Sequence, residues 1–192
     1  MTLRGRNKRA GFALAEVLMV TGILTSLGSG SFLNVQNKAH QVTCMNNLKQ
    51  IYTSIQLMTA AGDPLPKAWF FPPDNHPSRE TYNTVNLLKP QGCPPSMFIC
   101  PSAPEAIQQR KCCYLYNDTL GGKELDTVQN PSTTWLMMDV NVASAQIPPA
   151  HMGGGNVLFV DGHVKWLPAA ELPKLVAQAP TQGGQANPPD EE

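Results

Sequence analysis

The sequence predicts an α+β fold in which one long N-terminal helix packs on a small antiparallel β-sheet head with long loops. Residues 12–33 are apolar apart from Glu16, and a helical pattern of apolar residues continues from them to Met58. Further along, Asp161-Gly162 separates two short apolar runs, a pattern typical of a β-hairpin. The 18 prolines and 15 glycines lie mostly after residue 60, which favours a loop-rich second half over a helical bundle.

The first eleven residues are basic. They carry Arg4, Arg6, Lys8 and Arg9 and no acidic residue. Without these four, 10 basic residues face 14 acidic ones, a net charge of −4. The remaining chain therefore lacks the basic footprint of a nucleic-acid-binding protein, and no nucleic-acid partner is expected.

The apolar run that follows is long enough to cross a membrane. It contains 22 residues, which as a helix extend about 33 Å, and the positive-inside rule places the basic leader in the cytoplasm. A secretory signal peptide is one explanation, but Glu16 then lies inside its apolar core. A plain signal anchor is another, but a charge at the membrane centre costs on the order of 3 kcal/mol.

A third explanation accounts for the carboxylate. The basic leader, Gly11, and Phe12 opening an apolar helix with Glu16 four residues on resemble the class III leader of type IV prepilins and type II secretion pseudopilins. The resemblance implies cleavage by prepilin peptidase between Gly11 and Phe12, N-methylation of Phe12, and a role for Glu16 in assembly. It also implies a pilin-like fold, with residues 1–11 removed and residues 12–33 forming the transmembrane and filament-core part of the first helix.

Residues 34–62 form the second, amphipathic half of that helix. Apolar residues recur there at steps of three or four, which predicts one buried face; they are Val35, Ala39, Val42, Cys44, Met45, Leu48, Ile51, Tyr52, Ile55 and Met58. Gly62 followed by Asp63-Pro64 is expected to end the helix.

The head covers residues 63–177 and begins with a proline-rich connection. A short helix with Ser78 as its N-cap is expected in residues 78–88, and another in residues 167–178. The expected strands lie within residues 94–104, 111–117, 132–140 and 155–167, and the last of these ranges is a hairpin with a type I′ turn at Asp161-Gly162. Residues 178–192 are polar and rich in proline and glycine, so a disordered tail is expected.

Three further motifs carry a second resemblance. They are "CMNNLKQI" (44–51), "FICPSAP" (98–104), and His151 followed after nine residues by Asp161-Gly162. In this order they resemble signatures of a group of prepilin-type proteins abundant in planctomycetes and their relatives. The resemblance covers most of the chain and implies protein class and location, without implying a ligand.

The cysteines indicate an oxidising compartment. The chain has five, of which Cys93, Cys100, Cys112 and Cys113 fall within 21 residues. We expect Cys100 to pair with Cys44 on the helix and Cys93 to pair with Cys112 or Cys113, although spacing alone does not fix connectivity. Because five is odd, at least one thiol stays free or pairs between chains.

His151 has two interpretations. The favoured one is structural: His151 hydrogen-bonds backbone beside the tight loop Gly153–Gly155. The functional alternative makes it a ligand or polar anchor together with other polar residues of the head: Asp118, Asp139, Asp161 and His163. His163 itself, just past the turn, is expected to be exposed. No zinc-type cysteine spacing occurs, so neither a metal nor another cofactor is expected. A calcium site in the head, as in secretion pseudopilins, is the alternative, although the chain has no EF-like run of acids.

The predicted function is that of a structural subunit and not of an enzyme, since no P-loop, nucleophile elbow or paired catalytic carboxylates occur. The subunit would cross the inner membrane once, with a cytoplasmic N-terminus and a periplasmic head. Its partners would be prepilin peptidase, an inner-membrane assembly platform and other pilin-like subunits, in a type II secretion or type IV pilus-like filament in the periplasm or at the cell surface. The alternative is a membrane-anchored periplasmic or surface protein that binds glycan or another ligand and does not polymerise.

Overall fold

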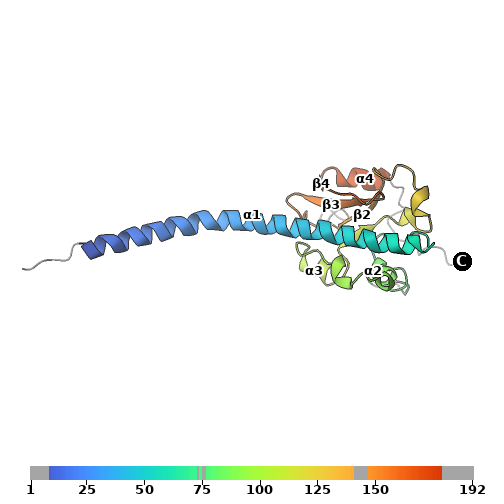
Figure 1. The fold of residues 1–192 in the computed structure, drawn as a ribbon, viewed down its shortest axis with the longest axis horizontal. Helices are drawn as coiled ribbons and strands as arrows, with labels where there is room; N and C mark the ends of the chain where they lie inside the picture. Colours follow the sequence, from blue (N-terminus) through green and yellow to red (C-terminus); the bar gives the residue numbers. More distant parts are fainter. Residues whose placement is uncertain (1–8, 73, 75–76, 141–146, 179–192) are drawn as a thin grey trace, which may run out of the picture. The chain divides into compact units, whose positions relative to one another are not determined.

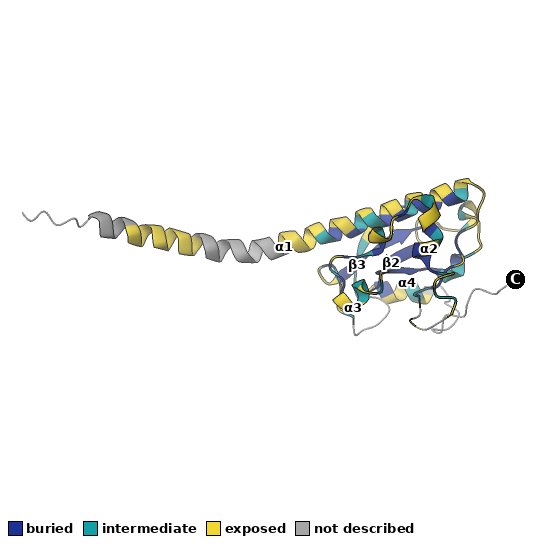
Figure 2. Cartoon of the chain, turned by 90° about the horizontal axis from the view of Figure 1, so that it is seen from below, coloured by how far each residue is buried: buried dark blue, intermediate teal, exposed yellow. Residues whose placement is uncertain are grey.

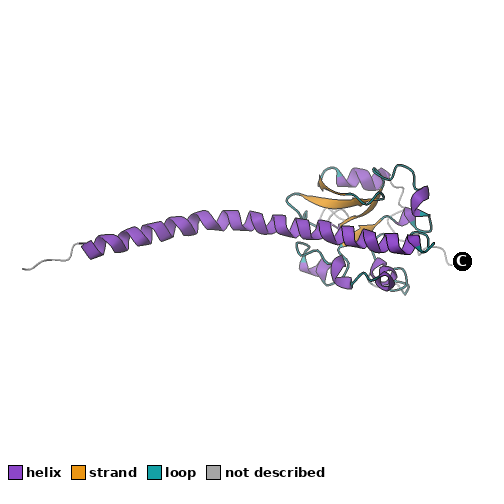
Figure 3. Cartoon of the chain, viewed as in Figure 1, coloured by secondary structure: helices purple, strands orange, loops and turns teal. Residues whose placement is uncertain are grey.

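The computed structural model describes residues 9–72, 74, 77–140 and 147–178, except for the side chains of residues 9–13 and 24–33. The chain divides into two compact units, Met1–Asn37 and Lys38–Glu192. Its described part combines helices with a four-stranded antiparallel sheet (Figures 1 and 3). The predicted α+β class is therefore confirmed.

Helix α1 spans Arg9–Ala60 and includes residues of both units. In the first unit, every described side chain from Leu14 to Ile23 is exposed. Among the residues that the structure describes, no helix is both long and apolar enough to cross a membrane. Most of the predicted span, residues 12–13 and 24–33, lies outside the described side chains, so a membrane half of α1 remains a prediction.

In the second unit α1 buries one face, as the sequence predicts (Figure 2). Cys44, Leu48, Ile51 and Ile55 are fully buried. The prediction was wrong for Val35 and Val42, which are 66% and 46% exposed, and for Ala39, which is also exposed. Positions 35, 39 and 42 lie roughly on the opposite side of α1 from the 44–48–51–55 stripe, and only one side of the helix can face the sheet.

The end of α1 confirms its predicted stop. Gly62 has a φ of +96°, and the N–H of Asp63 donates to the carbonyl of Met58. This left-handed glycine just beyond the helix is a common C-terminal cap, because a glycine adopts positive φ without a Cβ clash.

The sheet contains β1 (Tyr114–Tyr116), β2 (Trp135–Asp139), β3 (Gly154–Phe159) and β4 (Val164–Pro168), in the order β1-β2-β3-β4. Every neighbouring pair is antiparallel, and the register pairs Tyr114 with Asp139 and Met138 with Val157. Strands were predicted correctly in the ranges 111–117, 132–140 and 155–167, where β-branched and aromatic residues gather.

Alternation along the strands gives the sheet two buried faces. Tyr114, Tyr116 and Leu158 pack in one core with Leu48 and Ile55 of α1. The other face packs with α4 (Leu172–Gln178), in a core that includes Leu115, Trp135, Met138, Val157, Phe159 and Leu172. The head therefore consists of a sheet with a helix on each face.

Two predictions about the short elements need correction. Helix α2 spans only Thr84–Leu88, and Asn83 caps it in place of Ser78, because the Asn83 Oδ1 accepts from the N–H of Val85 at 3.0 Å. Residues 94–104 contain no strand but the 3₁₀ helix η2 (Pro95–Phe98), consistent with Pro94 and Pro95 lacking the N–H that a sheet requires. The other short helices are η1 (Lys89–Gln91), α3 (Glu105–Gln108), η3 (Asp118–Leu120) and η4 (Leu125–Thr127).

The final helix, α4, lies where it was predicted, in residues 167–178. The tail predicted to be disordered, residues 178–192, lies outside the described residues from position 179 onward.

The β3–β4 hairpin is present, but its turn is not the predicted type I′ turn. The loop has three residues, 160–162, because the N–H of Phe159 donates to the carbonyl of His163 at 3.0 Å. Gly162 has a φ of +88°, while Asp161 is not among the residues with positive φ, as a type I′ turn would require. The arrangement matches a type I turn followed by a left-handed glycine bulge, which three-residue hairpins favour.

Candidate functional site

Four chemically reactive side chains meet in the interior of the head. They are Cys44 of α1, Cys100 after η2, Asp139 at the end of β2, and His151 just before β3. Their Sγ, carboxylate and imidazole atoms all lie within 4.8 Å of one another. Each side chain is at most 1% exposed. All four belong to the second unit, and we call them the Cys₂AspHis cluster.

The two cysteines reach the cluster from different elements. Cys44 lies one turn before Leu48 on the buried face of α1. Cys100 lies in a loop that two backbone hydrogen bonds hold, from Cys113 N–H to the Phe98 carbonyl at 2.8 Å and from Ala103 N–H to the Cys100 carbonyl at 3.1 Å. The loop carrying Cys100 is thereby fixed against the residue that precedes β1.

Asp139 faces the cluster because of its position in the strand. Met138 faces α4, so the period of two turns Asp139 towards α1. The Asp139 Oδ2 accepts from the N–H of Asn156 at 2.6 Å. A buried carboxylate that accepts a backbone N–H is held in one orientation.

His151 is fixed by its own backbone. Its N–H donates to the Gly154 carbonyl at 3.2 Å, and its carbonyl accepts from the N–H of Gly154 at 3.0 Å. That carbonyl also accepts from the Trp166 Nε1 at 2.8 Å. The backbone of His151 thus bonds beside the glycine loop, while the predicted structural role of its side chain stays a prediction.

The imidazole of His151 has contacts that this interpretation did not include. Its Nε2 lies 3.4 Å from the Cys100 Sγ and 3.5 Å from the Asp139 Oδ2. Within the described part of the chain, the Nδ1 of His151 and the Oδ1 of Asp139 have no hydrogen-bond partner. Two polar atoms in the dry interior are thus left unsatisfied, which is uncommon.

The proximity of the groups changes their pKa values. The hydrogen bond with Cys44 lowers the pKa of Cys100 to about 5, against the effect of burial and with help from His151. Hydrogen bonding to Cys100 and burial raise the pKa of Cys44. Burial raises the pKa of Asp139 to about 7. Burial lowers the pKa of His151, but Cys100 and Asp139 outweigh that effect, so its pKa is raised.

The predicted disulfides are not formed. All five cysteines are free thiols and all are buried. The predicted proximity of Cys44 and Cys100 is nevertheless correct, since their Sγ atoms are neighbours in the cluster. Cys93 instead donates to the Sδ of Met97 at 3.8 Å, and Cys112 donates to the carbonyl of Tyr114 at 3.4 Å.

Of the residues considered as companions of His151, only Asp139 joins it. Asp161 instead forms an ion pair with His163, which is exposed, as predicted. The His163 ring stacks on Phe159 with centroids 4.3 Å apart. Asp118 is not a member of the cluster. The two ends of the His-x9-Asp-Gly motif therefore lie in different places: His151 is in the cluster, and Asp161-Gly162 is at the tip of the β3–β4 hairpin.

The grouping of the four residues was missed because each comes from a different segment of the chain. Zinc motifs are recognised by closely spaced ligands, and here the ligand positions are 44, 100, 139 and 151. The sequence did contain one signal for this grouping, since each of its three quoted motifs holds one residue of the cluster. Cys44 lies in "CMNNLKQI", Cys100 in "FICPSAP" and His151 in the His-x9-Asp-Gly motif.

The residues predicted to direct processing and assembly lie in the first unit. Gly11 and Phe12 fall within α1, and Glu16 is exposed on it. Comparison of the chain with protein-family models, with curated proteins and with solved structures found no match.

Proposed function

We propose that this chain is a pilin-like structural subunit, cleaved by prepilin peptidase between Gly11 and Phe12 and N-methylated on Phe12. It enters the inner membrane and assembles with other pilin-like subunits, on an inner-membrane platform, into a type II secretion or type IV pilus-like filament. It has no catalytic role. The observation that most supports the proposal is the apolar surface of α1 between Leu14 and Ile23.

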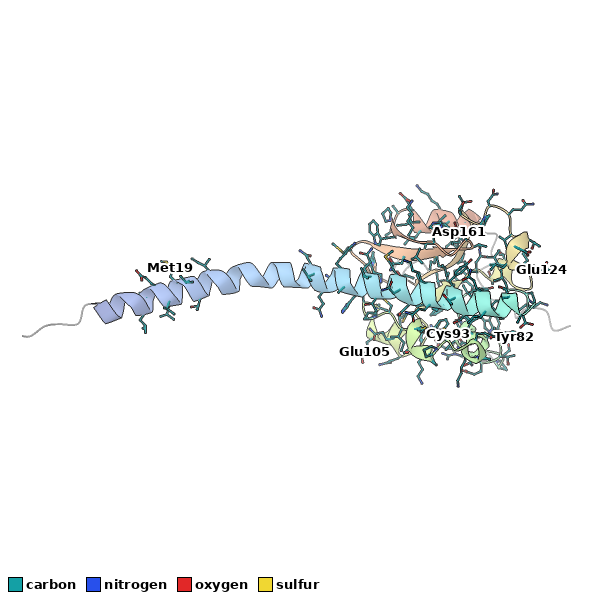
Figure 4. The ribbon with its side chains drawn as sticks, in the orientation of Figure 1. Met19, Tyr82, Cys93, Glu105, Glu124 and Asp161 are labelled. Carbon is teal, nitrogen blue, oxygen red and sulfur yellow. The ribbon has the colours of Figure 1, made fainter. Side chains whose placement is uncertain are left out.

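That surface is largely apolar, and all of its described side chains are exposed. Its large apolar side chains are between 52% and 70% exposed: Leu14, Val17, Leu18, Met19, Val20 and Ile23 (Met19 is labelled in Figure 4). Fully burying one such side chain contributes about 1.5–3 kcal/mol. A helix with a largely apolar surface is stable in lipid or packed among other helices. A pilin-like subunit would lie in the membrane before assembly and among other helices in the filament.

Glu16 is the exception within this surface, and the proposed cleavage supplies its partner. Removing residues 1–11 creates an amine on Phe12, about one helical turn before Glu16. In a filament the carboxylate of one subunit meets the Phe12 amine of the next. An unpaired charge in a low-dielectric core costs several kcal/mol, so this pair favours docking in a single register.

The other half of α1 supports a subunit in which stalk and head share one helix. Leu48, Ile51 and Ile55 belong to the main core of the head. The helix is therefore anchored in the core of the head. A filament subunit needs such an anchor to hold its folded domain.

The alternative, an anchored binding protein that does not polymerise, needs a ligand site on the head. A pocket of about 550 Å³ lies beside Asn117, Thr119 and Thr134. These polar groups already bond within the chain, as the Asn117 Nδ2 does to the Trp135 carbonyl and Thr134 Oγ1 to the Gln129 carbonyl. These bonded groups are not available to a glycan, and we favour the filament for the apolar surface of α1.

Glu16→Ala is the variant that tests the proposal. Filament yield, measured by shearing and electron microscopy in cells that carry the assembly system, should fall by about tenfold or more, the effect of losing a buried charge pair. Cleavage and membrane insertion should persist. Glu105→Ala, which removes an exposed head carboxylate (Figure 4), is the matched control and should assemble normally. Normal filament yield from Glu16→Ala would overturn the proposal in favour of the anchored binder.

A further inference from the structure

The Cys₂AspHis cluster places four ionisable groups where water does not reach. Cys44 and His151 are 0% exposed, and Cys100 and Asp139 are 1% exposed. Burying charged groups is unfavourable unless they are paired or bind a metal. The cluster contains three acidic groups against a single imidazole, so its fully ionised form carries an excess of negative charge.

Two distances within the cluster match the edges of a metal coordination tetrahedron. Zinc binds sulfur at about 2.3 Å and nitrogen or oxygen at about 2.0–2.2 Å, which separates tetrahedral ligand atoms by about 3.3–3.8 Å. The Nε2 of His151 lies 3.4 Å from the Cys100 Sγ and 3.5 Å from the Asp139 Oδ2. The Cys44 Sγ lies within 4.8 Å of all three.

One unsatisfied atom of the cluster, a carboxylate oxygen, also favours a cation. The Oδ1 of Asp139 is buried without a hydrogen-bond partner among the described residues, while its Oδ2 is held by the N–H of Asn156. A cation beside the carboxylate would satisfy it, and a carboxylate that also accepts a backbone N–H is typical of an oriented metal ligand.

We propose that Cys44, Cys100, Asp139 and His151 together bind one zinc ion in the interior of the head. Two thiolates and one carboxylate carry a charge of −3, and Zn²⁺ reduces the net charge of the site to −1. Both cysteines bind as thiolates and His151 through its neutral Nε2, so any proton that these groups hold before binding is released.

The ligand chemistry selects the metal. Two thiolates and an imidazole are soft or intermediate ligands that suit zinc, whereas calcium and magnesium require oxygen ligands. The site is closed on all sides and supplies four protein ligands, so it lacks the open position of a catalytic zinc centre. The ion is structural: it joins α1, the loop after η2, and the sheet at one point.

A Cys44–Cys100 disulfide is the competing state of the same residues. It would remove both thiolates, and Asp139 and His151 would remain buried with their unpartnered atoms. The two states exclude each other, since a sulfur in a disulfide is not available as a thiolate ligand. The grouping of Asp139 and His151 with the two thiols favours the metal, since a disulfide would need neither.

The test is metal analysis of the full-length protein, extracted in detergent without chelators or reductant. We expect about one zinc per chain by inductively coupled plasma mass spectrometry, as for other closed four-ligand sites. Peptide mapping after alkylation should find Cys44 and Cys100 unbridged. His151→Gln should lower the bound zinc by about tenfold or more. Cys93→Ala, which removes a buried thiol outside the cluster, should keep it.

Two measurements on the unmodified sequence keep the test decisive if a variant fails to fold. Cobalt added to chelator-stripped protein should give the thiolate-to-cobalt absorption of a tetrahedral site. Stripping should also lower the thermal midpoint, and adding zinc should restore it. The proposal is overturned if folded protein neither contains nor takes up zinc, if Cys44 and Cys100 are bridged, or if folded His151→Gln retains stoichiometric metal.

Discussion

The ring of Tyr52 lies against Gly162, in the space that a side chain at position 162 would occupy. The Tyr52 hydroxyl donates to the carbonyl of Val160 at 2.9 Å. Residues 110 positions apart are therefore joined at the point where α1 crosses the tip of the β3–β4 hairpin. The Asp-Gly pair is explained by packing on the helix as well as by its turn.

Gly162→Ala should destabilise the head for two reasons. The φ of +88° is strained for any residue with a Cβ, and the added methyl would meet the Tyr52 ring. We expect a loss of about 2–4 kcal/mol in the free energy of unfolding, as for strain combined with overpacking. Gly92→Ala is the control, because its φ is +78° but its Cβ would meet nothing within 4 Å. Equal losses in urea denaturation would rule out the packing contribution.

Tyr52→Phe should remove one hydrogen bond and leave the ring contact in place. The carbonyl of Val160 would lose the donor at 2.9 Å. The expected cost is about 1 kcal/mol, the usual net value of one such bond. A change of less than a few tenths of a kcal/mol in chemical denaturation would show that water replaces the hydroxyl.

Leu48→Ala should be far more costly than Val42→Ala. Leu48 is fully buried in the main core, whereas Val42 is 46% exposed on the same helix. Truncating a buried leucine costs about 2–5 kcal/mol, and a surface change usually costs less than about 0.5 kcal/mol. Comparable unfolding midpoints for the two variants would mean that the buried face of α1 is wrongly assigned.

The Asp161–His163 pair should make stability depend on pH in the acid range. Slight burial raises the pKa of Asp161, but the backbone N–H and ring of His163 outweigh it, so the net pKa is lowered. A carboxyl with a depressed folded pKa contributes stability above its unfolded pKa and loses it as pH falls through the folded pKa. Asp161→Asn should therefore lower the thermal midpoint at neutral pH and have no effect in strong acid. An equal effect at both pH values would contradict this role.

The sequence predicted the elements whose patterns are local. The short apolar run in residues 132–140 and the two runs around Asp161-Gly162 in residues 155–167 indicated β2, β3 and β4, and Gly62 indicated the end of α1. The errors arose where a tertiary contact chose between local options. Val42 and Cys44 are both apolar, and only packing against the sheet decides which one is buried.

The site required contacts between segments that are far apart in the chain. Cys44 and Cys100 were paired correctly as neighbours, but no local spacing indicates that Asp139 and His151 complete the group. The turn at Asp161-Gly162 shows the same limit. Its dipeptide suits a two-residue loop. The N–H of Val160 instead donates to the Thr134 carbonyl, and the Val160 carbonyl accepts from the Tyr52 hydroxyl, so Val160 belongs to a three-residue loop.

The central claim is that the chain is a processed, pilin-like subunit, and its most direct test is the intact mass of the protein extracted from membranes of cells that express prepilin peptidase. The account predicts a chain that begins at Phe12 and carries one methyl group on its amine. Gly11→Ala should leave the leader attached, while Gly62→Ala, beyond the membrane segment, should be cut normally. A chain that retains the leader in the presence of the peptidase, or one that begins near residue 30, would contradict the account.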